Sequence, residues 1–138
     1  MVTTHLKARQ GPLLTKMRAE QGRDLQAWLQ GVRDKGLPLL LTGDFNASPK
    51  EPVVELMLGE AGLGLRSAYR EPAFTKWCVR EYGEEKQVLD YIFHSPESLE
   101  TLATLELPSE QQVGENRLPS LSFPSDHLSL VADLKLLD

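Results

Sequence analysis

The sequence has 138 residues, of which 41% are hydrophobic and 25% charged, which is ordinary for one soluble globular domain and excludes a largely disordered chain. The formal net charge of −5 argues against broad, sequence-independent nucleic-acid binding, because such binding needs many Lys and Arg side chains to neutralise phosphates. No stretch approaches the roughly 18 consecutive apolar residues of a membrane span, so no membrane partner is expected. The single cysteine, Cys78, excludes an intrachain disulfide and favours an intracellular location.

The start of the chain predicts a strand followed by a helix. Residues 2–6 are rich in β-branched side chains and are typical of a strand. Alternation would place His5, Lys7 and Arg9 on one side, as either an anion site or a solvated polar face. Residues 12–35 show the apolar spacing of an amphipathic helix, but Gln21-Gly22 interrupts it, so the regular helix is expected to begin nearer Arg23.

A buried strand is predicted over residues 37–42, followed by a short helix that starts near Ser48. Ser48 would cap this helix, with Glu51 completing a capping box. From residue 65 the apolar period changes to two, which predicts strands rather than helices. The expected strands cover residues 65–69, 74–79, 88–93, 99–107 and 128–136, with a turn region at 83–86 and an irregular connection over 110–123.

Polar residues that could carry chemistry fall at or near the ends of these strands. Asp44 and Asn46 follow the buried strand, and alternation would point both to one side, although an Asx turn explains the pair equally well. Asp90 lies inside the most apolar strand and needs a cation or donor as partner. Asp126 and His127 are neighbours, so both can serve one site only from a turn or if one of them orients the other from behind. Carboxylates, an amide and imidazoles suit metal-assisted phosphoester hydrolysis.

Three motifs occur in a familiar order: Gly43-Asp-Phe-Asn46, Leu89-Asp-Tyr-Ile92 and Ser125-Asp-His127. They resemble the C-terminal half of the endonuclease/exonuclease/phosphatase superfamily. Residues 3–9, 116–120 and 124–131 are most similar to the nocturnin family, within the deadenylase-like branch. The resemblance covers essentially the whole chain and implies an α/β (α+β) fold, the C-terminal half of a four-layer α/β sandwich with its site at one rim.

The resemblance also implies Mg²⁺-dependent phosphoester hydrolysis without a covalent intermediate. In this mechanism Asp44 orients or deprotonates the attacking water, and Asn46 steadies the water or the phosphate. Asp90 pairs with His127, and His127 and His5 contact the phosphate. The remaining implied site residues are the metal ligand Asp126 and the substrate-binding cations Lys7, Arg9 and Arg80. The implied substrate is NADP or NADPH, which would lose its 2′-phosphate; a poly(A)-specific 3′-exonuclease is the alternative.

The family carries an Asn and its main metal-binding Glu before the strand that contains His5, whereas this sequence starts at that strand. Residues 1–138 are therefore expected to form a single C-terminal portion of the domain, weakly active or inactive alone. A non-catalytic half-domain that binds a phosphorylated ligand is a further alternative. An apolar sheet face is expected to be left open, which favours a homodimer or pairing with the N-terminal half. The cytoplasm and the mitochondrion both remain as locations.

Overall fold

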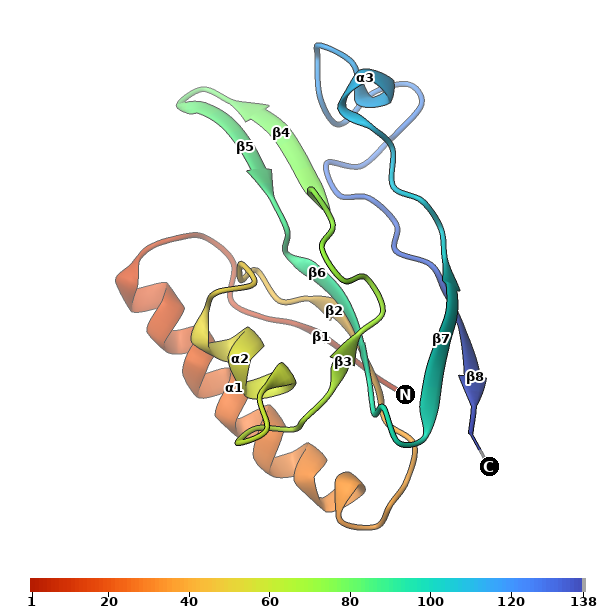
Figure 1. Ribbon diagram of the computed structural model, residues 1–138. Coiled ribbons are helices and arrows are strands. Elements are labelled where there is room, and N and C mark those ends of the chain that lie inside the picture. The colour runs from red at the N-terminus through yellow and green to blue at the C-terminus, as the bar shows by residue number, and fades with distance from the viewer. Residues whose placement is uncertain (138) are drawn as a thin grey trace.

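The computed structural model describes residues 1–137 as a mixed α/β fold with eight strands and three helices (Figure 1). In chain order the elements are β1 (Val2–His5), α1 (Pro12–Arg33), β2 (Leu40–Asp44), α2 (Pro52–Leu58), β3 (Arg66–Ser67), β4 (Lys76–Arg80), β5 (Gly83–Gln87), β6 (Asp90–His94), β7 (Leu99–Thr104), α3 (Glu110–Val113) and β8 (Ala132–Leu136). Strands and helices alternate in the first half, and strands dominate the second, as the apolar periods predicted.

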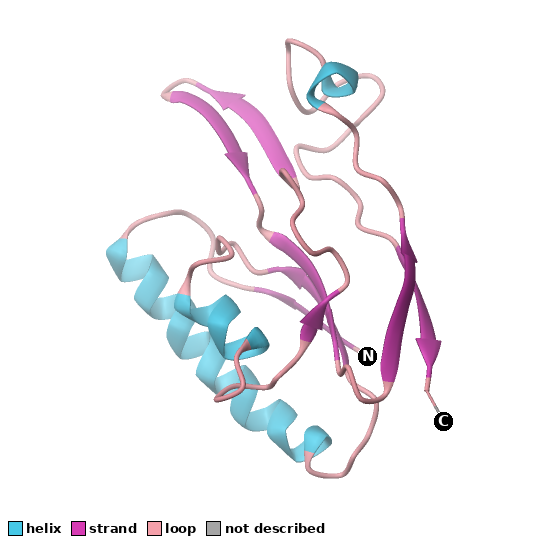
Figure 2. Ribbon diagram, in the orientation of Figure 1, coloured by secondary structure: helices cyan, strands magenta, loops and turns pink. Residues whose placement is uncertain are grey.

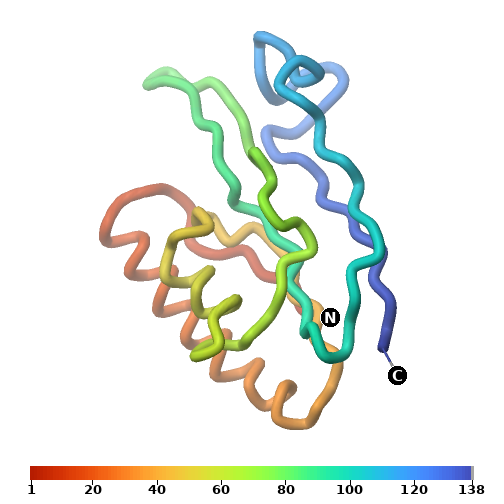
Figure 3. The backbone as a smooth tube through the Cα atoms, viewed as in Figure 1, coloured from red at the N-terminus to blue at the C-terminus, as the bar shows by residue number. Residues whose placement is uncertain are grey.

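A four-stranded sheet in the order β1-β2-β6-β3 forms the centre of the fold. β1 runs parallel to β2, whereas β6 is antiparallel to both β2 and β3. Helices α1 and α2 lie together on one side of this sheet (Figure 2). The hairpin β7-β8 lies on the other side, and the hairpin β4-β5 extends beyond the sheet (Figure 3). The predicted fold class, one sheet of the sandwich with its covering helices, is confirmed.

The main core lies between the sheet and its two helices. Phe45, directly after β2, is fully buried, and its ring packs edge-on against Phe93 at a centroid distance of 5.2 Å. Leu29 of α1 and Val54 of α2 close this core from the other side. A smaller cluster around Phe74, Trp77, Val113, Leu118 and Leu128 packs the hairpin β4-β5 against the loop before β8. Cys78 is a buried free thiol, as predicted.

Helix α1 is continuous from Pro12 to Arg33, so the expected interruption at Gly22 is wrong. Gly22 faces α2: a Cβ atom there would lie 2.6 Å from the Cγ2 of Val53. This glycine lets two helices pack closely, and tertiary packing outweighs its low helix propensity. Helix α2 begins at Pro52 with Glu51 as its N-cap and no side-chain capping bond, so the expected Ser48 cap is also wrong.

Two expectations about the strands are wrong for related reasons. Residues 83–87 form β5 rather than a turn, because the hairpin β4-β5 turns earlier, at residues 81–82. β1 ends at His5, so strand alternation does not carry Lys7 and Arg9, and Arg9 adopts a positive φ of 76°. Both segments are charged and exposed, so neither carries an apolar period that would indicate its structure.

The apolar residues expected on an open sheet face are mostly buried. Leu39, Leu41, Leu89 and Phe93 are all shielded from solvent. Several large exposed apolar side chains lie on or next to the hairpin β7-β8, and they are Leu102, Leu105, Val131 and Leu136. Pairing with a second copy or with the N-terminal half stays a prediction. Within residues 1–137, no helix is both long enough and apolar enough to cross a membrane.

The side chain of Arg18 ties α1 to the start of α2 and to the loop after β1. It is completely buried, and its Nη2 donates to Glu51 Oε2 at 2.8 Å. Its Nη1 donates to the carbonyl oxygens of Lys7 and Arg9, at 3.1 and 2.7 Å. A buried guanidinium that satisfies one carboxylate and two carbonyls fixes both segments.

We expect Arg18→Met to lower the free energy of unfolding by about 3–5 kcal/mol, because it leaves the Glu51 carboxylate without its buried partner. Urea denaturation followed by circular dichroism measures this loss. Arg23→Met, at an exposed position of the same helix, is the control and should stay within about 0.5 kcal/mol of the parent. A loss below about 1 kcal/mol for Arg18→Met would contradict the role given to this network.

Candidate active site

The register of the central sheet places three of the predicted residues in one row. His5 of β1 lies opposite Asp44 of β2, and Asp44 lies opposite Asp90 of β6. Paired residues on neighbouring strands project to the same face of a sheet. Here this is the face opposite the helices, because the alternate residues Phe45 and Tyr91 belong to the helix-covered core. The Nε2 of His5 is 3.5 Å from Asp44 Oδ2.

Gly43 allows this register. Its φ of 145° is one that side-chain-bearing residues rarely adopt, and a Cβ atom there would lie 1.9 Å from the carbonyl oxygen of Thr4. Only glycine therefore permits β1 to approach β2 at this point. The glycine of the first motif thus has a structural reason, which is the placement of His5 beside Asp44.

Asp44 and Asn46 form the predicted Asx turn, and the turn orients Asp44. The Oδ1 of Asp44 accepts a hydrogen bond from the backbone N–H of Asn46 at 2.8 Å, and Asn46 has a φ of 50°. The other carboxylate oxygen of Asp44, Oδ2, faces His5 and His127. Burial raises the pKa of the Asp44 carboxyl above its usual value, although the bond from Asn46 opposes this shift.

The side-chain amide of Asn46 forms a hydrogen bond with the backbone. Asn46 is 8% exposed, and its Nδ2 donates to the carbonyl oxygen of Leu6 at 3.1 Å. It therefore holds the end of β1 against the turn after β2. Its positive φ means that strand alternation does not set its direction, and its contact with a water or phosphate stays a prediction.

His127 reaches the row from a loop far along the chain. The loop at residues 126–128 pairs with β4 and with Thr75, the residue before it. The backbone N–H of Trp77 donates to the carbonyl oxygen of Asp126 at 3.2 Å, and the N–H of Leu128 donates to that of Thr75 at 2.8 Å. The Oγ of Ser125 accepts from the backbone N–H of His127 at 3.1 Å, which gives the turn that the sequence predicted.

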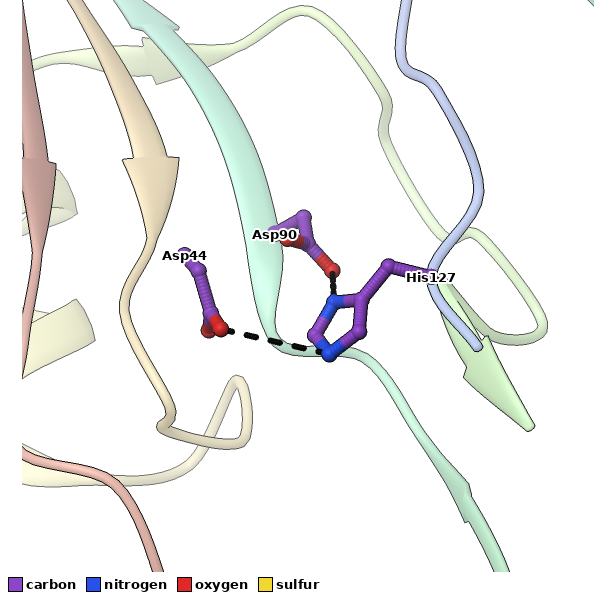
Figure 4. A group of neighbouring side chains, drawn as sticks. All are labelled: Asp44, Asp90 and His127. Atoms are coloured by element: carbon purple, nitrogen blue, oxygen red, sulfur yellow. Dashed lines mark hydrogen bonds and ion pairs between the residues drawn. The ribbon is translucent and has the colours of Figure 1, made fainter. Parts of the chain in front are cut away.

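The His127 imidazole lies between two carboxylates (Figure 4). Its Nδ1 is 2.8 Å from Asp90 Oδ2, and its Nε2 is 4.0 Å from Asp44 Oδ2. The carboxylate of Asp90 therefore accepts the hydrogen bond from Nδ1–H, and Nε2 faces the carboxylate of Asp44. The hydrogen bond to Asp90 raises the pKa of His127 above its ordinary value, against the opposing effect of burial.

Thr75 completes this arrangement and was not among the predicted residues. Its completely buried hydroxyl donates to Asp90 Oδ2 at 2.7 Å and accepts from the N–H groups of Leu89 and Asp90, at 2.9 and 3.1 Å. Thr75 thus orients the carboxylate that orients His127. A lone Thr at the start of a strand gives little signal, because its partners are 14 and 15 residues away.

Asp126 lies apart from the group that could hold a metal ion. Its carboxylate accepts from Arg80 at 2.8 Å. Asp44, Asp90 and His127 instead place one potential ligand atom each within 4.8 Å of one another. The Nδ1 of His127 is already bonded to Asp90, so the atoms that remain for an ion are carboxylate oxygens and the Nε2 of His127. Carboxylate oxygens are the ligands that a hard, largely hydrated divalent ion prefers.

A cationic pocket of about 760 Å³ adjoins the turn at Asn46. Among the predicted substrate-binding residues, Arg9 and Arg80 line it, whereas Lys7 does not. Lys76 also lines the pocket, pairs with Glu85 at 3.1 Å, and was missed because it sits in a strand otherwise predicted as core. Arg9 forms no ion pair with any residue from 1 to 137 and can accept an anionic ligand.

Comparison with known proteins matches residues 6–127 to the Endonuclease/Exonuclease/phosphatase family. The chain is 43% identical to nocturnin of Drosophila melanogaster over 99% of its length and 25% of that protein. It is also 43% identical to nocturnin of Homo sapiens, over 96% of its length and 32% of that protein. The chain thus spans about a third or less of these curated relatives.

Solved structures agree with this assignment. The human nocturnin catalytic domain with a bound sulfate anion superposes with a TM-score of 0.77 at 36% identity, covering 99% of this chain and 47% of that one. ANGEL2, a 2′,3′-cyclic phosphatase, in complex with adenosine-2′,3′-vanadate shares the fold with a TM-score of 0.76 at 24% identity, over 98% and 56% of the two chains. The family predicted from the three motifs is confirmed: this chain belongs to the endonuclease/exonuclease/phosphatase family.

Proposed function

We propose that this chain carries part of a phosphoester hydrolase site of the nocturnin type, which removes the 2′-phosphate of NADP or NADPH. The main support is the cluster of His5, Asp44, Asp90 and His127 at one end of the sheet, beside a cationic pocket. Similarity to the nocturnins supports the same class of reaction. The reaction adds water to phosphorus and breaks the bond between phosphorus and the ribose 2′-oxygen, giving NAD or NADH and inorganic phosphate.

In this proposal Asp44 is the general base. Its partial burial makes the carboxylate more basic than one in water, and Oδ2 is the oxygen left by the Asx turn. Asp44 Oδ2 would take a proton from the attacking water. His127 would donate from Nε2 to a phosphate oxygen, with Asp90 and Thr75 holding the ring from behind. His5, whose side chain is 71% exposed, would contact the phosphate from the other end of the row.

A divalent ion, Mg²⁺ in our proposal, would be held by the carboxylate of Asp90, with water completing its shell and Asp44 left to act as the base. When bound, it supplies positive charge next to the phosphate oxygens. Asp126 as a metal ligand stays a prediction, and its carboxylate would first have to leave Arg80. The direct role of Asp126 here is to hold Arg80 at the mouth of the site.

A compact dinucleotide suits this site better than a long RNA. The cations of the pocket, Arg9, Lys76 and Arg80, are few, and Lys76 and Arg80 already have acidic partners. A chain with net charge −5 lacks the extended positive surface that poly(A) would need for tight, salt-dependent binding. Poly(A)-specific 3′-exonuclease activity is therefore the second candidate, and a half-domain that only binds a phosphorylated ligand is the third.

We expect Asp44→Asn and His127→Gln each to lower the rate of phosphate release from NADP by about 10²-fold or more in Mg²⁺, because each removes a proton-transfer group. Phosphate release is followed by a coupled colorimetric assay on the purified chain, in excess over substrate to detect slow turnover. Asp24→Asn, at an exposed position on α1, is the matched control and should keep the parent rate.

The same assay separates the candidate functions. Oligoadenylate shortened faster than NADP is dephosphorylated would favour the exonuclease. Specific binding of NADP over NAD without phosphate release would favour the binding half-domain. Phosphate release that is unchanged in both Asp44→Asn and His127→Gln would rule out the proposed roles of these residues.

We expect the pKa of His127, read from its imidazole resonances, to lie above 6.5 and to fall in Asp90→Asn, which keeps an acceptor for Thr75 but removes the charge. A raised folded-state pKa means that His127 stabilises the fold most below its unfolded value of about 6.5 and that this contribution is lost as pH rises through the folded value. The difference in unfolding free energy between the parent and Asp90→Asn should therefore be largest below about pH 6.5 and shrink as the pH rises through the folded-state pKa of His127. An unchanged His127 pKa in Asp90→Asn would contradict the assigned pairing.

A further inference from the structure

A second polar cavity lies at the other end of β6. Asp90 begins this strand and His94 ends it, and both project to the face opposite the helices, because they are separated by an even number of residues. At about 3.3 Å per residue, the two positions are about 13 Å apart. The cavity has a volume of about 530 Å³, and the polar residues Arg66, Ser67, Arg70, His94, Glu100 and Thr101 line it.

His94 lines this cavity, and one of its ring nitrogens is buried and unpartnered. The residue is 4% exposed, and its Nε2 lies 3.0 Å from the hydroxyl oxygen of Thr101. Its Nδ1 has no hydrogen-bond partner in the part of the chain that the structure describes. Buried polar atoms are nearly always hydrogen-bonded, so an unpaired nitrogen in a cavity-lining residue points to a ligand atom. If the Thr101 hydroxyl donates to Nε2, Nδ1 carries the proton and is a donor.

Two arginines give the cavity a positive charge. Arg66 lies directly opposite His94 in the register of β3 and β6, and Arg70 lies four residues after Arg66 along the chain. Neither guanidinium forms an ion pair with any of residues 1–137, and Glu100 is the one carboxylate in the described lining. The cavity is therefore locally positive on a chain of net charge −5. Guanidinium groups bind phosphate oxygens in a bidentate manner, which exposed lysines do not.

We propose that this cavity binds a phosphate group, held by Arg66 and Arg70 with His94 Nδ1–H as a further donor. The site is separate from the row of His5, Asp44 and Asp90 and does not depend on the proposed function. Inorganic phosphate and the phosphate of a nucleotide monoester share the chemistry that these side chains recognise.

The histidines of the chain make the proposal directly testable, because there are three of them and they divide between the two sites. His94 reports the cavity, whereas His5 and His127 report the candidate active site. When the ¹⁵N-labelled chain is titrated with inorganic phosphate at constant ionic strength, we expect the His94 ring resonances to shift until the binding is saturated. Sodium chloride at equal ionic strength should give no such saturating shift.

The arginine variants supply the control. Arg66→Gln with Arg70→Gln should weaken the phosphate affinity read at His94 at least about tenfold, because two charge-assisted contacts are lost. Arg23→Gln, exposed on α1, should leave it unchanged. Both arginines of the cavity are exposed, and the backbone amide spectrum of the double variant verifies that it folds.

A parallel titration with adenosine 5′-monophosphate distinguishes the two sources of the phosphate. Tighter binding of the monoester at His94 assigns the cavity to nucleotides, and equal or weaker binding assigns it to free phosphate. A His94 response that is absent, that does not saturate with either ligand, or that is the same in the double variant would overturn the proposal. Saturating shifts confined to His5 and His127 would also overturn it.

Discussion

The close approach of β1 to β2 at Gly43 is the constraint on which the candidate site depends. A side chain at this position would overlap the carbonyl oxygen of Thr4, so no other residue permits this pairing. The pairing sets the parallel register, and the register alone places His5 beside Asp44 and Asp44 beside Asp90. A one-residue slip would turn His5 to the helix-covered face. The chemistry at the end of the sheet therefore follows from backbone geometry before any side chain contacts another.

Buried polar groups then connect this row to distant segments. The buried hydroxyl of Thr75 donates to the carboxylate of Asp90, which in turn accepts from the imidazole of His127. The loop that carries His127 pairs with the backbone around Thr75. At the other end of the row, the amide of Asn46 donates to the carbonyl oxygen of Leu6, and the guanidinium of Arg18 donates to those of Lys7 and Arg9. Each of these groups would be costly to bury without its partner. The loops beside the site are thus fixed by the same bonds that satisfy the interior.

Much of this could be predicted from the sequence where the signal is local. The apolar periods identified the helix at residues 12–33 and most strands, and the three motifs identified Asp44, Asp90 and His127 together with their family. What was missed depends on tertiary packing or lies in strands without an apolar period. Gly22 was read as a helix breaker because the packing of Val53 against it cannot be seen in the sequence. β5 has no apolar period, because its charged residues pair with β4 at the surface.

The charge balance of the site explains why its parts must act together. Asp44 and Asp90 lie opposite each other on neighbouring strands, and the charge of Asp90 adds to burial in raising the pKa of Asp44. A phosphate entering beside two carboxylates would be repelled unless positive charge accompanies it. The raised pKa of His127 favours its charged form, and Arg9 and Arg80 add positive charge from the adjoining pocket. In the proposed reaction the carboxylates would then serve as base and metal-binding groups, and the peripheral cations would select the phosphate that is held.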